Sequence, residues 1–167
     1  MGFSLIPQYS FRAITDISPD FLHSNGVKFL MLDLDNTVAA YSEDNPAEEV
    51  LKWVETVKNG GISLAIISNS TRAARVDTFA KALGIGYIIR ASKPSPTGVQ
   101  QLMETAGFTN EESALVGDQV FTDTLAANRA GVMSIIVKPR KFTNPFLALR
   151  YAAEIPFRIM VKSNEQY

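Results

Sequence analysis

Two aspartates stand one residue apart at the end of an apolar run in the stretch FLMLDLDNTVA, which covers residues 29–39. An unpaired carboxylate is costly to bury, by several kcal/mol or more. Asp33 and Asp35 therefore either serve as turn residues at the end of a strand or belong to a site that uses carboxylates. The ends of the other apolar runs decide between these two interpretations.

Four apolar runs in the sequence are each followed by polar or charged residues. In chain order these are Asp33, Asp35 and Thr37 after residues 27–32, Ser68 and Asn69 after 62–67, Lys93 after 87–89, and Asp118 and Asp123 after 113–116. In open parallel sheets, ligands bind at the carboxyl ends of the strands, near the switch in strand order. We therefore expect these side chains to converge on one site.

This set of groups is suited to phosphoryl transfer. Carboxylates are ligands that Mg²⁺ prefers, and the ion keeps waters or phosphate oxygens as its remaining ligands. A lysine and a hydroxyl would hold the phosphoryl group and balance its charge. One ionised aspartate could attack phosphorus, and a second carboxyl could act as general acid and base. The chain has no cysteine, which argues against zinc.

The elements that must position these residues alternate between strands and helices. Residues 27–32, 62–67, 87–89, 113–116 and 133–137 read as strands, and 45–61, 70–85, 95–108 and 118–131 as helices. Asn45 is expected to cap the first of these helices, with Pro46 at its first position. The alternation predicts an α/β, Rossmann-like three-layer fold with a five-stranded parallel sheet.

The bulk composition fits one ordinary domain spanning residues 1–167. The net charge of −1 gives no reason to expect nucleic acid as a partner. The first residues lack a basic segment followed by an apolar one, so no secretory signal is expected. The longest uncharged run, residues 59–71, is shorter than the ~20 residues needed to span a bilayer. We expect a cytoplasmic protein.

The motifs DLDNT, SNS, KP and GDQVFTD, in this order and at strand ends, resemble the four motifs of the haloacid dehalogenase (HAD) superfamily. Within subfamily IIIA the chain is similar to the YqeG-like branch, which is related to phosphatidylglycerophosphate phosphatases. The resemblance covers a core of residues 27–138 and, more weakly, the preceding LIPQYSFRAITDIS. Because the links at residues 37–45 and 89–93 are short, the protein should lack the cap domain found in other members.

The resemblance implies a role for each motif residue. Asp33 would be the nucleophile that forms an aspartyl-phosphate, and Asp35 the general acid and base. Ser68, Asn69 and Lys93 would hold the phosphoryl group. The implied Mg²⁺ ligands are Asp33, the backbone carbonyl of Asp35, Asp118 and Asp123. The second aspartate of the first motif argues for a phosphatase, because the dehalogenases of the superfamily lack it.

Several functions remain open at this point. The substrate is either a lipid phosphate, for which the family suggests phosphatidylglycerophosphate, or a soluble phosphorylated metabolite. A phospho-aspartate switch of the receiver type would also gather acids, a hydroxyl and a lysine at strand ends. A non-catalytic binding protein on the same fold is a further alternative, because fold alone does not determine function.

Residues 139–167 form a basic, aromatic C-terminal extension. From Lys138 to Tyr167 there are six Lys or Arg and two Glu, a net charge of +4. One interpretation is a helix that packs on the flank of the sheet with a solvated basic face. A second is peripheral contact of residues 139–162 with the inner face of the membrane, and a third is homodimerisation. We expect Pro156 to divide the segment into two short helices.

Overall fold

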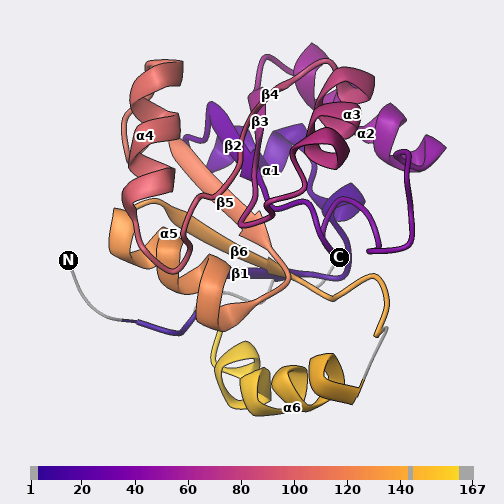
Figure 1. The fold of residues 1–167 in the computed structure, drawn as a ribbon. Coiled ribbons are helices and arrows are strands. Elements are labelled where there is room, and N and C mark those ends of the chain that lie inside the picture. Colours follow the sequence, from indigo (N-terminus) through magenta and orange to yellow (C-terminus); the bar gives the residue numbers. More distant parts are fainter. Residues whose placement is uncertain (1–3, 143–144, 162–167) are drawn as a thin grey trace.

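A computed structural model describes residues 4–142 and 145–161. In this part of the chain, six strands form one parallel sheet in the order β1-β6-β5-β2-β3-β4 (Figure 1). The strands are β1 (Tyr9–Phe11), β2 (Phe29–Leu32), β3 (Ser63–Ile67), β4 (Gly86–Ile88), β5 (Ser113–Gly117) and β6 (Met133–Val137). The predicted α/β fold with a parallel sheet is confirmed, with β1 as an additional strand that the sequence did not predict.

The additional strand β1 lies at one edge of the sheet and pairs with β6. Its three residues are too few to show a periodic pattern. Contacts with β6 from outside the strand hold it in place: the Gln8 side chain accepts a hydrogen bond from the Ser134 backbone N–H at 2.9 Å. These contacts are between segments more than a hundred residues apart, so no local signal marks the strand.

Helices cover both faces of the sheet and make the expected three layers. They are η1 (Ile14–Asp16), α1 (Pro19–Ser24), α2 (Glu48–Asn59), α3 (Ala73–Leu83), α4 (Thr97–Ala106), η2 (Val120–Thr124), α5 (Leu125–Ala130) and α6 (Pro145–Ile159). Alternate residues of a strand point to opposite faces. In β2, Leu30 and Leu32 join the core beneath α2 and α3, whereas Phe29 and Met31 join the core beneath α4 and α5.

The start of α2 differs from the prediction. The helix begins at Glu48 rather than Pro46, and Ala47 occupies the N-cap position without a side-chain capping bond. The Asn45-Pro46 pair is a plausible helix start in isolation. Here, the guanidinium of Arg75 binds the backbone carbonyls of Ala40 and Glu43, so the chain entering the helix is fixed by tertiary contacts.

The helix predicted over residues 118–131 is present from Val120 to Ala130, but it is not α-helical throughout. The segment begins with a π-helical turn, η2, and continues as the short α-helix α5. The wider turn carries Asp123 toward the end of β5, where a Cβ added at Gly117 would lie only 2.3 Å from the Asp123 carboxylate. Such π-turns are rare and often lie at functional sites.

Helix α6 is one continuous helix, so the predicted break at Pro156 is wrong. A proline inside a helix removes one backbone hydrogen bond and destabilises it by roughly 3 kcal/mol. Contacts of the last turn with the rest of the protein offset this loss: Arg158 donates to the Val137 carbonyl, and Phe157 packs edge-on against Phe121. Residues 143–144 and 162–167 of the predicted extension lie outside the described residues.

No cap domain is inserted in either link of the described chain. Residues 33–47 connect β2 to α2, and residues 89–96 connect β4 to α4. Across residues 4–142 and 145–161, none of the helices combines the length and the apolar character needed to cross a bilayer.

Candidate active site

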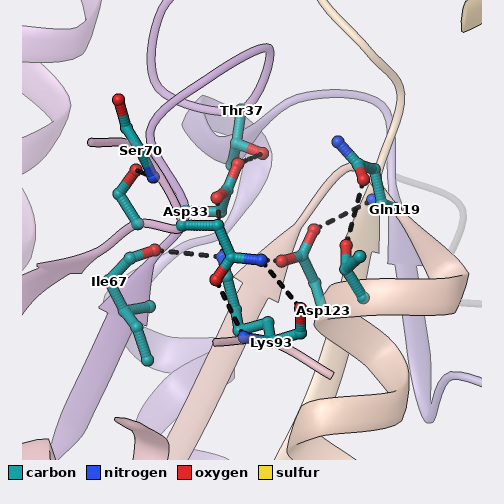
Figure 2. A network of polar contacts seen from close by, with 10 residues as sticks. Asp33, Thr37, Ile67, Ser70, Lys93, Gln119 and Asp123 are labelled. Carbon is teal, nitrogen blue, oxygen red and sulfur yellow. Dashed lines mark hydrogen bonds and ion pairs between the residues drawn. The ribbon is translucent and has the colours of Figure 1, made fainter. Parts of the chain in front are cut away.

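Asp33 and Lys93 form a buried ion pair at the carboxyl edge of the sheet, as Figure 2 shows. The Lys93 Nζ lies 2.7 Å from Asp33 Oδ1, and the Thr37 hydroxyl donates to Asp33 Oδ2 at 3.1 Å. Asn36 adopts a left-handed conformation with φ of 66°, which asparagine tolerates better than most residues. This turn brings Thr37 back over the carboxylate, so both oxygens of Asp33 are held.

The side chain of Asn69 positions Lys93 from the end of β3. It accepts a hydrogen bond from the Lys93 backbone N–H at 2.8 Å and donates one to the Lys93 carbonyl at 2.7 Å. The Lys93 Nζ also donates to the carbonyl of Ile67 at 3.0 Å. Asn69 was predicted to bind phosphate, and the structure gives it a further role in fixing the lysine.

Asp123 approaches the same lysine from η2. Its Oδ1 lies 2.7 Å from Lys93 Nζ, and its Oδ2 accepts from the Gln119 backbone N–H at 3.1 Å. The close packing of its carboxylate over Gly117 excludes any side chain at that position. Asp123 is 2% exposed, so it is a buried residue of the site and not a charge on a helix surface.

Asp118 is buried, and neither oxygen of its carboxylate has a hydrogen-bond partner. One ligand oxygen from each of Asp33, Asp118 and Asp123 can be chosen so that all lie within 4.8 Å of one another. A buried carboxylate without partners is strongly unfavourable unless a cation neutralises it. This orphaned group and the all-oxygen donor set fit a divalent cation of the hard-oxygen class.

Burial, with the charges of neighbouring carboxylates, raises the pKa values of Asp33 and Asp118. Burial raises the pKa of Asp33 to about 7; the Lys93 ammonium opposes this effect, and Asp123 adds to it. Burial and the neighbouring charges of Asp33 and Asp123 also raise the pKa of Asp118 well above its usual range. Burial alone would lower the pKa of Lys93, but the carboxylates of Asp123 and Asp33 outweigh this and raise it. The lysine is therefore charged at neutral pH, and the excess negative charge favours a bound cation.

Asp35 is held by an arginine that the sequence reasoning missed. The Arg75 Nε lies 3.3 Å from Asp35 Oδ1, and the same guanidinium stacks over the ring of Phe79. Arg75 also binds the carbonyls of Ala40 and Glu43, so one side chain joins α3, Asp35 and the link that follows it. In the sequence, Arg75 is only a charged residue next to the apolar stripe of α3. Such residues are common on solvent-exposed helices, so nothing marked this one as part of the site.

A cavity of about 70 Å³ opens among these groups. Its lining comprises Asp33, Asp35, Tyr41, Ser68, Asn69, Ser70, Lys93, Gln119, Thr122 and Asp123. Two larger hollows of about 420 and 460 Å³ lie elsewhere and gather no such set of groups. The small cavity is of the scale of a phosphoryl group. The structure therefore places all the predicted side chains except Asp118 along this cavity, with Asp118 beside Asp33 and Asp123.

Tyr41 is a second residue of the site that the sequence did not indicate. It is half-buried at the cavity, and burial together with the charges of Asp118, Asp35 and Asp33 raises the pKa of its hydroxyl to about 12. The hydroxyl therefore remains protonated and can donate a hydrogen bond at neutral pH. Its position in the short link after the first motif carries no pattern that would distinguish it from a packing tyrosine.

The parallel-sheet α/β fold and this set of side chains define a site of the phosphoryl-transfer type, and comparison with known proteins identifies the family. A family model described as haloacid dehalogenase-like hydrolase matches residues 11–131. The chain belongs to this family, which confirms the resemblance of its four motifs.

Two curated relatives are phosphatases by name. The chain is 31% identical to a protein of Bacillus subtilis named "Probable phosphatase YqeG", over 93% of this chain and 89% of the relative. It is 30% identical to phosphatidylglycerophosphate phosphatase 1 of Arabidopsis thaliana, over 86% of this chain but only 44% of that protein. The family and these relatives identify the chain as a phosphatase.

Two solved structures share the fold of this chain. A 3-deoxy-D-manno-octulosonate 8-phosphate phosphatase of Moraxella catarrhalis, solved with magnesium and phosphate ions, matches with a TM-score of 0.52 and 20% identity over 81% of this chain and 90% of that one. An uncharacterised protein of Listeria monocytogenes matches with a TM-score of 0.56 and 20% identity, over 71% and 85%. At these identities, the likeness shows the fold.

Proposed function

We propose that this phosphatase hydrolyses a phosphomonoester in a Mg²⁺-dependent reaction through a phosphorylated Asp33, and that its substrate is phosphatidylglycerophosphate. The observation that carries the mechanism is the position of Asp33 at the cavity, with Lys93 on one oxygen and Asp35 two residues further along the chain. A carboxylate nucleophile, a cation and a second carboxyl group are the parts that this two-step chemistry needs.

In the first step a carboxylate oxygen of Asp33 attacks phosphorus. The bond from Asp33 to phosphorus forms as the bond from phosphorus to the leaving oxygen breaks. Lys93 and Ser68 hold the phosphoryl oxygens, and Asp35 in its protonated form gives its proton to the leaving oxygen. Arg75 keeps the Asp35 carboxyl turned toward the cavity through its contact with Oδ1.

In the second step Asp35, now ionised, takes a proton from a water molecule. The water oxygen attacks phosphorus, the bond to Asp33 breaks, and inorganic phosphate leaves with the nucleophile regenerated. One carboxyl thus serves as acid and then as base, an effect worth roughly 10²–10⁴ in rate.

Mg²⁺ would be held by Asp33, Asp118 and Asp123 together with the backbone carbonyl of Asp35. When bound, it neutralises the repulsion between the carboxylates and the phosphate oxygens. The fit of the site to such an ion rests on the partnerless, buried carboxylate of Asp118.

Two findings support a phospholipid phosphate as substrate. One is the relationship to the Arabidopsis phosphatidylglycerophosphate phosphatase, although this chain spans less than half of that protein. The other is the small cavity without an inserted cap, which leaves the rest of the substrate outside the protein and places no limit on its size.

The test is phosphate release with Mg²⁺ from phosphatidylglycerophosphate in detergent micelles, beside a panel of soluble phosphomonoesters. Asp33→Asn and Asp35→Asn proteins serve as inactive controls. Release from the lipid far above the panel, and its loss in both variants, is the expected result. Release from a soluble ester alone would contradict the lipid assignment while keeping the mechanism. A stable phosphorylated protein with no released phosphate would instead favour a phospho-aspartate switch of the receiver type.

A further inference from the structure

Helix α6 has its polar side chains on the inner side and its apolar side chains on the outer side. Among its described residues, every exposed one is apolar: Pro145, Phe146, Ala148, Leu149, Ala152, Ala153, Ile155, Pro156 and Ile159. At 3.6 residues per turn these positions span about half of the helix circumference. We call this set the outer face of α6. A surface helix of a globular protein normally shows the opposite arrangement.

The inner side of α6 carries the polar groups and attaches the helix to the catalytic edge. Glu154 is buried and pairs with Arg158 at 2.9 Å. Arg158 also donates to the backbone carbonyls of Val137 and Asp118. The predicted solvated basic face of the helix is therefore wrong, because neither Arg150 nor Arg158 is exposed and Arg158 binds the backbone that carries Asp118.

The outer face, together with Phe142 before the helix and Met160 after it, carries most of the large exposed apolar side chains of the described residues. Within residues 4–142 and 145–161, six of the eight large exposed hydrophobic side chains lie between Phe142 and Met160. Phe146, Leu149 and Ile159 are each at least 70% exposed. Scattered exposed apolar residues are ordinary, whereas a contiguous set of this size marks an interaction surface.

The link before α6 supplies positive charge to the same surface. Phe142 packs edge-on against Tyr151 of α6, so the link and the helix form one surface. Lys138 and Lys141 on this link are exposed. In residues 138–142 and 145–161 the one acidic side chain is the buried Glu154, so the exposed charge of this segment is wholly positive.

We propose that the outer face of α6 docks on an anionic lipid bilayer. The apolar face of the helix would be buried at the boundary between the headgroups and the acyl chains. The flanking lysines would lie against the negatively charged surface of the bilayer. A second copy of the chain fits less well, because it would bring its own Lys138 and Lys141 beside the face and, in the described residues 138–142 and 145–161, no exposed carboxylate to pair with them. The outer face also offers no side-chain hydrogen bonds, which protein interfaces ordinarily contain.

This proposal rests on the proposed function, because docking on a bilayer would serve catalysis only if the substrate is a lipid. Through Arg158 the inner side of the helix is tied to the Asp118 carbonyl, so a bilayer on the outer face would be separated from the carboxyl edge by about one helix diameter, ~10 Å. The phosphate group of a lipid could then enter the cavity while its acyl chains remain in the membrane.

The test is co-sedimentation with vesicles of phosphatidylglycerol and phosphatidylcholine, and with vesicles of phosphatidylcholine alone, in the absence of substrate. The unchanged protein should sediment with the anionic vesicles. In a variant with Phe146→Ser, Leu149→Ser and Ile159→Ser, partitioning into the vesicles should fall at least about tenfold. Each substitution removes the free energy gained when an apolar side chain moves from water into the bilayer. Lys138→Glu with Lys141→Glu should weaken binding to the anionic vesicles several-fold.

The matched control is Leu51→Ser with Tyr87→Ser, which removes exposed apolar side chains on α2 and β4 and should leave sedimentation unchanged. Thermal unfolding and turnover of a small soluble aryl phosphate should be unaltered in every one of these variants. An unchanged protein that stays in the supernatant would overturn the proposal. So would a dimer that the triple variant converts to monomer, since a second copy would then occupy the face.

Failure of docking is distinguishable from failure of the proposed function. Sedimentation requires no turnover, so a protein that binds vesicles but releases no phosphate from the lipid would retain the docking surface and lose the substrate assignment. A protein that hydrolyses the micellar lipid but ignores vesicles would retain the substrate and lose the docking surface.

Discussion

The carboxyl edge of the sheet and the outer face of α6 depart from ordinary burial in opposite directions. At the edge Asp33, Lys93, Asp118 and Asp123 are charged or titratable groups that the fold removes from water. On α6 large apolar side chains are left in water. Both arrangements lower the stability of the free protein, and each is relieved by a ligand of matching chemistry. Departures of this kind are expected where function competes with folding.

The first prediction separates the two regions by their effect on chemistry. Asp33→Asn should lower turnover of every phosphomonoester by at least about 10³-fold, because the amide is a poor nucleophile. Its thermal unfolding temperature should not fall, since a carboxylate next to Asp118 and Asp123 is removed. Serine substitutions on the outer face of α6 should leave turnover of a soluble aryl phosphate unchanged. Comparable losses from both regions would contradict the separation.

The second prediction tests how tightly the catalytic edge is packed. Gly117→Ala should destabilise the protein by about 3 kcal/mol, because the added methyl would overlap the Asp123 carboxylate. Turnover should fall as Asp123 is displaced from Lys93. Gly86→Ala is the matched control in β4, where an added Cβ meets nothing within 4 Å. Urea unfolding of the two variants gives the comparison, and equal midpoints would show that the edge has room to adjust.

The catalytic edge was largely predictable from the sequence because its information is local. Each motif follows its own apolar strand, and parallel strands end at one edge. The sequence therefore placed Asp33, Lys93 and Asp118 together without knowledge of the packing. Arg75 was not predictable in this way, because its contacts with Asp35 and Ala40 depend on how α3 lies over the link.

The third prediction assigns that positioning role to Arg75. Arg75→Ala should lower kcat by roughly 10–100-fold for alkyl phosphates, whose leaving oxygen needs the proton of Asp35. For p-nitrophenyl phosphate the loss should be much smaller, since its leaving group needs no proton. Arg72→Ala, at an exposed arginine in the turn before α3, is the control. A uniform loss on both classes of ester would show that Arg75 acts on the fold in general.

The fourth prediction concerns pH and metal. Burial raises the pKa of Asp33 to about 7 in the metal-free fold, from an ordinary value of 3.8 in the unfolded chain, so the folded state binds more protons between these values. Stability in a chelator should therefore fall as pH rises from about 4 to 7, with a drop in Tm of roughly 5 °C. Mg²⁺ at pH 8 should restore it, and Asp33→Asn should reduce the pH dependence. A metal-free Tm that rises over this range would contradict the assignment.

The C-terminal helix shows where prediction from sequence ends. Its composition, basic and apolar together, was evident, but the side on which each residue lies was not. A solvated basic face was expected because charged side chains usually seek water. In the structure Arg158 instead pairs with the buried Glu154 and donates to the carbonyls of Val137 and Asp118. Those contacts also hold the helix together past Pro156, which local propensity alone would not predict.

The central claim is that Asp33 carries the phosphoryl group, and its most direct test is to trap that state. Asp35→Asn protein with Mg²⁺ and p-nitrophenyl phosphate should release about one equivalent of nitrophenolate in a burst, because only the second step needs the base. Acid quenching, borohydride reduction and peptide mass mapping should then locate the modification at Asp33 alone. A burst with no modified Asp33, or modification of another residue, would contradict the account.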